Sequence, residues 1–401
     1  MTTNHTKPYE RVQLFSGGGS RFGYYLGSYA ALVEHDLKPD MIIGTCGGSL
    51  SAYLVKLASD PKDLQGLMYS RELYSVIKAI RHVTPDEANR RAKMRYMTHA
   101  LKRLGLSLSH QSSKAQLHRQ ADSYARLLDE LQQLAMFRID NEEQWLDELS
   151  SFASSRQSDF DANKTTPEIA IIASRLYSMP FDSNMADALA NDNLKLQELL
   201  FAPLRLADYL SDLPTELMTS PAHAFASERI HPPVKLLTQW DIQSVVRASM
   251  ADMYYLPPTH ITELGWCLGG VINLTPIELA CQLAETVFAE TKDGYDAWLA
   301  APAIKRVFGF DPNARLATVH SYQSQAALSK VTSPKATQPH WLPFADNAQQ
   351  LTGQNVHKRF NLQQMTVELI HADYDGFVQQ MQAQWQYGYQ RTIDYIQQHQ
   401  L

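Results

Sequence analysis

One short segment has the residue types and the spacing of a nucleophilic site. Residues 41–52 read MIIGTCGGSLSA, a β-branched run followed by small residues that can begin a helix. Gly44 and Gly48 lie two residues before and after Cys46, which is the spacing of a G-x-S-x-G nucleophile elbow with cysteine in place of serine. The turn in such an elbow is so tight that only glycine fits at those positions. A thiol presented there lies at a helix N-terminus, which favours the thiolate and hence attack on a carbonyl carbon.

A second glycine cluster lies upstream of this segment. Residues 11–19 read RVQLFSGGG, a strand-like stretch that ends in Gly17, Gly18 and Gly19. Three glycines between a strand and a helix allow successive N–H groups to converge on one point, which suits a phosphate or an oxyanion. A dinucleotide-binding turn needs G-x-G-x-x-G, and Phe22 stands where its third glycine should be. A nucleotide-binding turn is therefore the weaker interpretation.

Taken together, these segments resemble the patatin-like lipid acyl hydrolases. Residues 16–54 contain that family's order of a glycine-rich oxyanion loop, a helix, a Pro-Asp step and the elbow. Three later segments also resemble the family, namely TPEIAIIASRL (166–176), VVRASMA (245–251) and WCLGGVINLTPIELA (266–280). The resemblance implies a three-layer α/β/α fold of the patatin-like type, interrupted by a helical insertion.

The resemblance also assigns roles to individual residues. Cys46 stands at the nucleophile position, and the backbone groups of Gly18, Gly19 and Arg21 match the oxyanion donors. In the family the aspartate of an Asp-Gly-Gly segment takes the proton from the nucleophile, but this chain has Leu268 at that position. Leucine cannot accept a proton, and general-base catalysis typically contributes about 10²–10⁴-fold. We therefore expect a catalytically impaired hydrolase fold that still binds a lipid or an acyl ester.

Two alternative functions stay open. Cysteine has a reference pKa of about 8.5, so Cys46 could support an active acyl hydrolase or acyltransferase that acts on lipid esters without a dedicated base. A remote group such as His35, Asp252 or Glu263 could also replace the missing base, and sequence spacing does not decide this. The second alternative is a nucleotide-binding α/β protein that uses the glycine turn at residues 17–19.

Composition narrows the class of protein. A net charge of −6 and a pI near 6.2 argue against general nucleic-acid binding. Cys46, Cys267 and Cys281 have neither the spacing of a disulfide framework nor that of a metal site, so we expect no metal and no cofactor. The polar N-terminal residues and the lack of an apolar run of about 18–20 residues favour a cytoplasmic protein.

Periodicity predicts how the chain is organised. We expect a patatin-like domain over 11–280 that contains a helical insertion at 61–165, and a C-terminal extension, 281–401, that completes the sheet or packs on it. Within the insertion, residues 81–120 carry nine Lys and Arg against two acidic residues. Such a stretch could make peripheral contact with an anionic membrane, although a solvated helical face is the simpler interpretation.

Periodicity and composition also predict secondary-structure elements near the C-terminus. Residues 276–300 have a helical pattern, and the region 306–322 reads as a strand. Residues 327–360 are rich in Ser, Thr, Pro, Gln and Asn and read as surface loop. A helix from about residue 374 carries an aromatic stripe that we expect to pack on the sheet.

Overall fold

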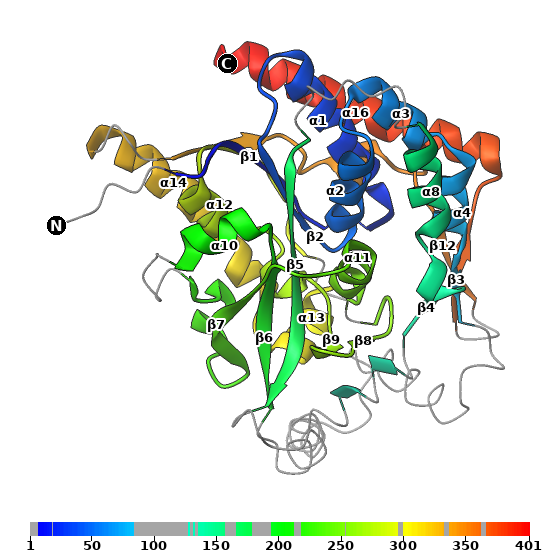
Figure 1. Cartoon of the computed structure of the whole chain (residues 1–401), viewed down its shortest axis with the longest axis horizontal. Coiled ribbons are helices and arrows are strands. Elements are labelled where there is room, and N and C mark those ends of the chain that lie inside the picture. Colours follow the sequence, from blue (N-terminus) through cyan, green and yellow to red (C-terminus); the bar gives the residue numbers. More distant parts are fainter. Residues whose placement is uncertain are drawn as a thin grey trace.

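Figure 1 shows the computed structural model of this chain, which describes residues 7–17, 19–83, 127–128, 131–132, 135–156, 166–178, 194–211, 218–252, 254–295, 300–332, 337–361 and 366–401. All structural statements below concern these residues. Gly18 and most of the basic stretch 81–120 lie outside the described residues.

A nine-stranded sheet forms the centre of the described part of the chain (Figure 1). Its strands are β1 (Tyr9–Phe15), β2 (Met41–Thr45), β5 (Glu168–Ser178), β6 (Leu194–Phe201), β7 (Ile230–Leu237), β8 (Thr259–Ile261), β9 (Gly265–Cys267), β10 (Ala284–Glu290) and β11 (Gln338–Leu342). The strands β11, β10, β1, β2 and β5 run parallel in that spatial order. β6 then pairs antiparallel with β5, β7 pairs parallel with β6, and the β8–β9 hairpin joins β5 through β9.

Side chains of the central strands alternate between two cores, one on each face of the sheet. Ile42 and Ile171 belong to one buried cluster, whereas Ile43 and Ile172 belong to the other. The period of two along each strand explains this division. The first face is covered by α1 (Gly23–Glu34), α2 (Gly47–Leu57), α3 (Pro61–Met68), α4 (Arg71–Lys78), α8 (Asp147–Arg156), α11 (Ile242–Met250) and α16 (Tyr374–His399). The second face is covered by α10 (Leu204–Ser211), α12 (Ile277–Leu283), α13 (Ala300–Phe308) and α14 (Pro312–Thr332).

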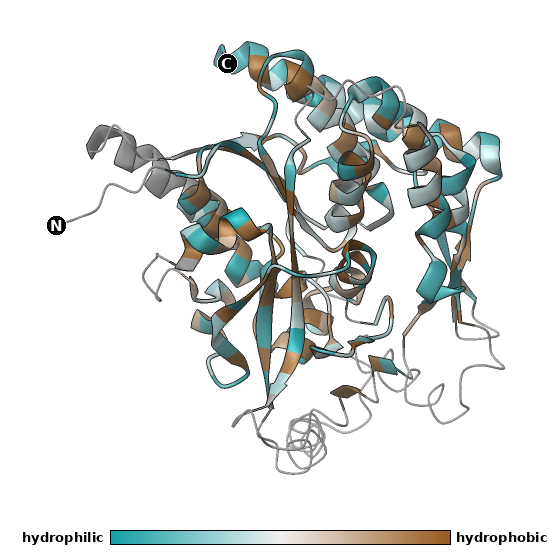
Figure 2. Cartoon of the chain, viewed as in Figure 1, coloured by the Kyte–Doolittle hydropathy of each residue, from teal (hydrophilic) through white to brown (hydrophobic). Residues whose placement is uncertain are grey.

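This arrangement confirms the predicted three-layer α/β/α fold. Figure 2 shows hydrophobic residues on the strands and on the helix sides that meet them, with hydrophilic residues outside. Two small antiparallel pairs lie apart from the main sheet, β3 (Ile80–His82) with β4 (Phe137–Ile139) and β12 (His357–Asn361) with β13 (Thr366–Ile370). The short helix α15 (Asn347–Gln350) precedes β12.

Several helices begin where the sequence supplies a capping side chain. Asp60 caps α3 by accepting a hydrogen bond from the Lys62 N–H, and Ser70 caps α4 by accepting one from the Leu73 N–H. Asp373 does the same for α16. These bonds satisfy N–H groups that have no partner within the helix. The start of α16 at residue 374 confirms the expected C-terminal helix.

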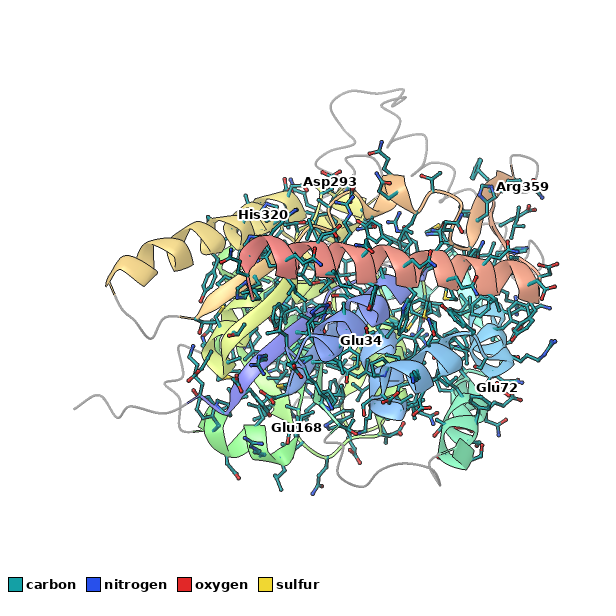
Figure 3. All side chains as sticks on the ribbon, turned by 90° about the horizontal axis from the view of Figure 1, so that it is seen from above. Glu34, Glu72, Glu168, Asp293, His320 and Arg359 are labelled. Carbon is teal, nitrogen blue, oxygen red and sulfur yellow. The ribbon has the colours of Figure 1, made fainter. Side chains whose placement is uncertain are left out.

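The C-terminal helix α16 packs mainly along α1 rather than directly on the sheet. Figure 3 shows α16 crossing the length of the molecule next to α1, whose last residue Glu34 accepts a hydrogen bond from Tyr389. A Cβ atom at Gly27 would lie 2.0 Å from the Trp385 carbonyl oxygen, and one at Gly388 would lie 1.9 Å from the Tyr24 carbonyl oxygen. The two helix backbones therefore touch, and each contact point requires glycine.

The prediction of a helix throughout residues 276–300 is wrong after Leu283. Residues Ala284–Glu290 form β10, which lies between β1 and β11. Val287 and Phe288 are buried in the cores on opposite faces. A strand buried on both faces reads as a short apolar run, which periodicity does not separate from a helix.

The prediction of a strand over 306–322 is also wrong, because this region contains α13 and α14. Gly309 has a φ of +85° directly after α13. Asp311 then accepts a hydrogen bond from the Asn313 N–H, and Pro312 is the first residue of α14. These are a helix stop and a helix start that outweigh the β-branched residues.

The loop expected at 327–360 is only partly correct. This range contains the end of α14, the edge strand β11, α15 and the start of β12. β11 pairs with β10 over Gln338–Leu342 although it contains a proline, Pro339. Proline is tolerated in an edge strand, where one side of the strand makes no ladder hydrogen bonds.

We expect Gly27→Ala and Gly388→Ala to destabilise the protein, although alanine favours a helix by about 0.8–1.0 kcal/mol over glycine. The added methyl group would overlap the backbone of the facing helix, and overpacking typically costs about 1–3 kcal/mol. Thermal unfolding of each variant shows whether its stability falls or rises relative to wild type. Gln382→Ala, at an exposed position of α16, is the matched control and should change stability by less than about 0.5 kcal/mol. An unchanged or raised Tm for Gly27→Ala would contradict the close helix contact.

Candidate active site

Cys46 occupies the sharp turn between β2 and α2. Its backbone has φ of 50° and ψ of −126°, a conformation that L-residues rarely adopt. Such local strain often marks a functional position. A Cβ atom at Gly48 would lie 1.8 Å from the Phe15 carbonyl oxygen, and one at Gly44 would lie 2.8 Å from Ser49 Cα. The elbow therefore needs both glycines for the reason that the sequence spacing indicated.

A serine from α11 fixes the elbow to the neighbouring strand. The Cys46 N–H donates to Ser249 Oγ at 2.9 Å, and the Ser249 hydroxyl donates to the Ile172 carbonyl at 2.6 Å. The Cys46 carbonyl accepts from both the N–H and the hydroxyl of Ser49. The segment 245–251, singled out by its family resemblance, thus holds the nucleophile turn in place.

The glycine-rich loop lies directly against the elbow. A Cβ atom at Gly17 would be 3.3 Å from Cys46 Sγ, and one at Gly47 would be 3.0 Å from the Gly19 nitrogen. Gly18 lies outside the described residues, so its predicted role stays a prediction. Arg21 ends the short 3-10 helix Gly19–Arg21, and its Nε is buried without a hydrogen-bond partner in the described residues. The two glycine clusters of the sequence therefore form one site.

Leu268 lies in the core and offers no proton acceptor. Its side chain is 1% exposed and belongs to the apolar cluster on the second face of the sheet. Its N–H donates to the Ser174 carbonyl at 2.9 Å. The residue that follows, Gly269, has a φ of +89°, and a Cβ atom there would lie 2.0 Å from Asp252 Oδ1. Gly269 therefore leaves room for a carboxyl group that comes from another part of the chain.

Asp252 brings that carboxyl group to the nucleophile. It follows α11 by two residues, is 3% exposed, and its carboxyl group interacts electrostatically with the Cys46 thiol. Oδ1 accepts from the Val271 N–H at 3.3 Å, whereas Oδ2 is buried and makes no hydrogen bond of good geometry within the described residues. Burial raises the pKa of Asp252 to about 7, against the opposing effect of the Cys46 thiol and of backbone N–H groups. A general base with this pKa suits neutral pH.

At neutral pH the thiol of Cys46 is protonated. Burial of the sulfur and the neighbouring Asp252 carboxylate raise its pKa well above the ordinary value, while the Gly47 N–H and the Lys292 ammonium act in the opposite direction. Because the two groups interact directly, their protons titrate as a pair. A thiol beside a carboxylate is the arrangement in which the proton can move as sulfur attacks.

The other candidate bases do not lie at this site. His35 is exposed at the C-terminal end of α1, the end away from the glycine loop, and Glu263 is exposed in the turn between β8 and β9. Sequence reasoning named Asp252 beside these two and had no basis for choosing it. Its position directly after the segment 245–251 was the available signal, since Ser249 of that segment binds the elbow.

The described ranges contain neither a disulfide bond nor a cluster of side chains that could bind a metal ion. All three cysteines are free, and Cys46 is partly exposed whereas Cys267 and Cys281 are buried. No group of three or more His, Cys, Asp or Glu in those ranges could hold a metal ion. Among the described helices, none combines the length and the hydropathy that a membrane span requires.

Comparison with known proteins identifies the family to which the sequence is similar. A family model for patatin-like phospholipases matches residues 14–281, a range that contains Cys46, Asp252 and Leu268. Two patatin-like phospholipase domain-containing proteins of Pyricularia oryzae, from strains 70-15 and Y34, are each 52% identical over 48 residues. That match covers 12% of this chain and only 6% of each relative's length. The crystal structure of VipD from Legionella pneumophila aligns with a TM-score of 0.33 and 10% identity, covering 98% of this chain and 67% of VipD.

The raised pKa of Asp252 predicts how stability depends on pH. A carboxyl group whose pKa rises on folding stabilises the protein below its unfolded pKa, and this contribution is lost as pH rises through the folded value. The window therefore runs from about 3.8 to about 7. Asp252→Asn removes the ionisation, so we expect its stability relative to wild type to increase across this window by up to roughly 4 kcal/mol.

Thermal unfolding at pH about 5 and about 8 measures the part of this difference that lies above pH 5, roughly 3 kcal/mol. Asp208→Asn, at an exposed position of α10, is the control and should show no such trend. A difference between wild type and Asp252→Asn that is the same at both pH values would contradict the buried carboxylate.

Proposed function

This chain belongs to the patatin-like phospholipase family, and from that premise we propose that it hydrolyses lipid acyl esters with Cys46 as nucleophile and Asp252 as general base. The observation that carries the proposal is the buried Asp252 carboxyl group, for which Gly269 leaves room and which interacts electrostatically with the Cys46 thiol. Impaired catalysis was expected because Leu268 leaves no base at the usual sequence position. A carboxyl group supplied by a different segment removes the reason for that expectation.

The proposed reaction uses the pair in two stages. Cys46 Sγ attacks the ester carbonyl carbon while the thiol proton moves to the Asp252 carboxylate. The tetrahedral intermediate expels the alcohol, which takes the proton from Asp252, and the acyl group remains on sulfur as a thioester. A water molecule, deprotonated by Asp252, then attacks the thioester and releases the fatty acid and the free thiol.

Backbone N–H groups would stabilise the negative charge of the intermediate. The donors we propose are those of Gly18, Gly19 and Arg21, in keeping with the family resemblance. The approach of Gly19 to Gly47 supports this assignment for the described part of the loop. Oxyanion donors of this kind contribute substantially to acyl transfer because they need not reorganise as charge develops.

The substrate class follows from the family rather than from the site alone. Patatin-like phospholipases suggest a lipid substrate, and the proposed ligand is a lipid or acyl ester. Peripheral contact with a membrane through the basic stretch 81–120, and a cytoplasmic location, remain proposals that rest on the sequence. An acyltransferase would use the same thioester with an alcohol in place of water.

We expect Cys46→Ala to abolish turnover of p-nitrophenyl esters, since no thioester can form. Asp252→Asn should lower kcat by about 10²–10⁴-fold with little change in KM, because the base acts in the transition state. In the wild type, kcat/KM should rise with pH through about 7, since the ionised form of Asp252 is the active one. Steady-state kinetics over a pH series measure all three effects.

Two variants serve as matched controls. Cys281→Ala removes a buried thiol from α12, and Asp208→Asn removes an exposed carboxylate, so both should keep wild-type kinetics. Lipid hydrolysis that survives Cys46→Ala would refute the thiol mechanism. Absence of turnover combined with a thermal shift on adding fatty acids would favour a binding protein, and a shift with nucleotides alone would favour the nucleotide-binding alternative.

A further inference from the structure

A lysine outside the proposed dyad reaches the glycine-rich loop. Lys292 lies two residues after β10, next to Asp293, which is labelled in Figure 3. Its Nζ donates to the Gly17 carbonyl at 3.0 Å and forms an ion pair with Glu290 Oε1 at 2.7 Å. One ammonium group therefore connects the end of β10 to the loop beside the nucleophile.

The carboxylate that holds this lysine is itself fixed. Glu290 is 2% exposed, and it accepts hydrogen bonds from the Tyr24 hydroxyl at 2.6 Å and the Tyr25 hydroxyl at 2.5 Å. Both tyrosines lie in the first turns of α1, which directly follows the glycine-rich loop. A buried carboxylate with three hydrogen-bonding partners leaves little freedom for the Lys292 side chain, which is 12% exposed.

The Lys292 ammonium is also close enough to act on the nucleophile. A Cβ atom at Gly17 would lie 2.9 Å from Cys46 Cβ, so the residue that Lys292 binds is in contact with Cys46. The positive charge of Lys292 lowers the pKa of the Cys46 thiol and opposes the effects of burial and of Asp252. Lys358 and Tyr295 also interact electrostatically with Cys46.

We propose that Lys292 is a positioning residue of the Cys46 site, which holds the Gly17 carbonyl turned toward itself and keeps a fixed positive charge beside the sulfur. The first effect holds the Gly17 carbonyl oxygen at the Lys292 ammonium, so that this oxygen does not turn toward the developing oxyanion. The positive charge of Lys292 favours the thiolate form of Cys46 and the negatively charged tetrahedral intermediate. The catalytic part of this role rests on the proposed function, whereas the effect on the thiol does not.

Alkylation of Cys46 by iodoacetamide tests the charge without requiring ester turnover, because the thiolate is the reactive form. Lys292→Met should slow alkylation near neutral pH by about tenfold, which corresponds to one unit in the thiol pKa. Lys292→Arg should restore the rate. Lys292→Gln keeps a hydrogen-bond donor without the charge, so it should alkylate as slowly as Lys292→Met and retain a higher kcat.

Glu290→Gln distinguishes this role from a general loosening of the fold. It removes the carboxylate charge, but the glutamine amide oxygen can still accept a hydrogen bond from the Lys292 ammonium, so the cation stays at the Gly17 carbonyl and alkylation should not slow. A purely structural role would make Glu290→Gln and Lys292→Met slow alkylation alike, and that result would overturn the proposal. Lys305→Met, at an exposed position of α13, is the matched control and should alkylate at the wild-type rate.

Steady-state kinetics together with alkylation rates separate the proposed role of Lys292 from the proposed hydrolase function. In an active enzyme Lys292→Met should lower kcat more than it changes KM, because the charge acts mainly in the transition state. An unchanged alkylation rate in folded Lys292→Met would overturn the role of Lys292 even if esters are hydrolysed. Absence of turnover in the wild type would refute the proposed hydrolase, and the alkylation rates would still decide the role of Lys292.

Discussion

The electrostatic interaction between the buried Asp252 carboxyl group and the Cys46 thiol is the interaction on which the arrangement of this site depends. A carboxyl group with a pKa of about 7 spends much of its time protonated at neutral pH, because its surroundings exclude water. Burial of this carboxyl group lowers the stability of the folded protein whenever the group ionises. The surrounding chain must therefore hold the carboxyl group in place. In the proposed mechanism the same burial makes Asp252 a better base, because its proton affinity is closer to that of the groups with which it exchanges a proton.

Residues around β4 contribute to holding this carboxyl group. The loop after Asp252 contains Tyr254, with a φ of 63°, and the Tyr254 and Tyr255 carbonyls accept hydrogen bonds from the N–H groups of Met136 and Phe137. Arg247 in α11 forms an ion pair with Glu142 at 2.7 Å. The residues that carry the base are thus bound to a segment more than a hundred positions earlier. Packing of this kind keeps a strained loop in one conformation.

Local features of the site could be predicted from the sequence, whereas its long-range contacts could not. Gly44 and Gly48 surround Cys46 at a spacing with one structural meaning, so the elbow was predictable. Asp252 reaches the thiol only because Ser249 fixes α11 against β5 and the elbow. No periodicity encodes that contact. β10 was misread for a similar reason, since pairing with β1 and β11 outweighs the helical pattern of its residues.

The residue at the family's base position therefore does not by itself determine whether a carboxyl group lies near the nucleophile. The space around that position matters more. Leu268 fills the apolar core, where a carboxylate would be costly, and Gly269 leaves the volume that Asp252 Oδ1 occupies. A side chain at position 269 would collide with that oxygen, so the glycine is needed although the aspartate before it is absent. In the proposed mechanism the proton acceptor comes from the segment after α11 and not from the segment that holds Leu268.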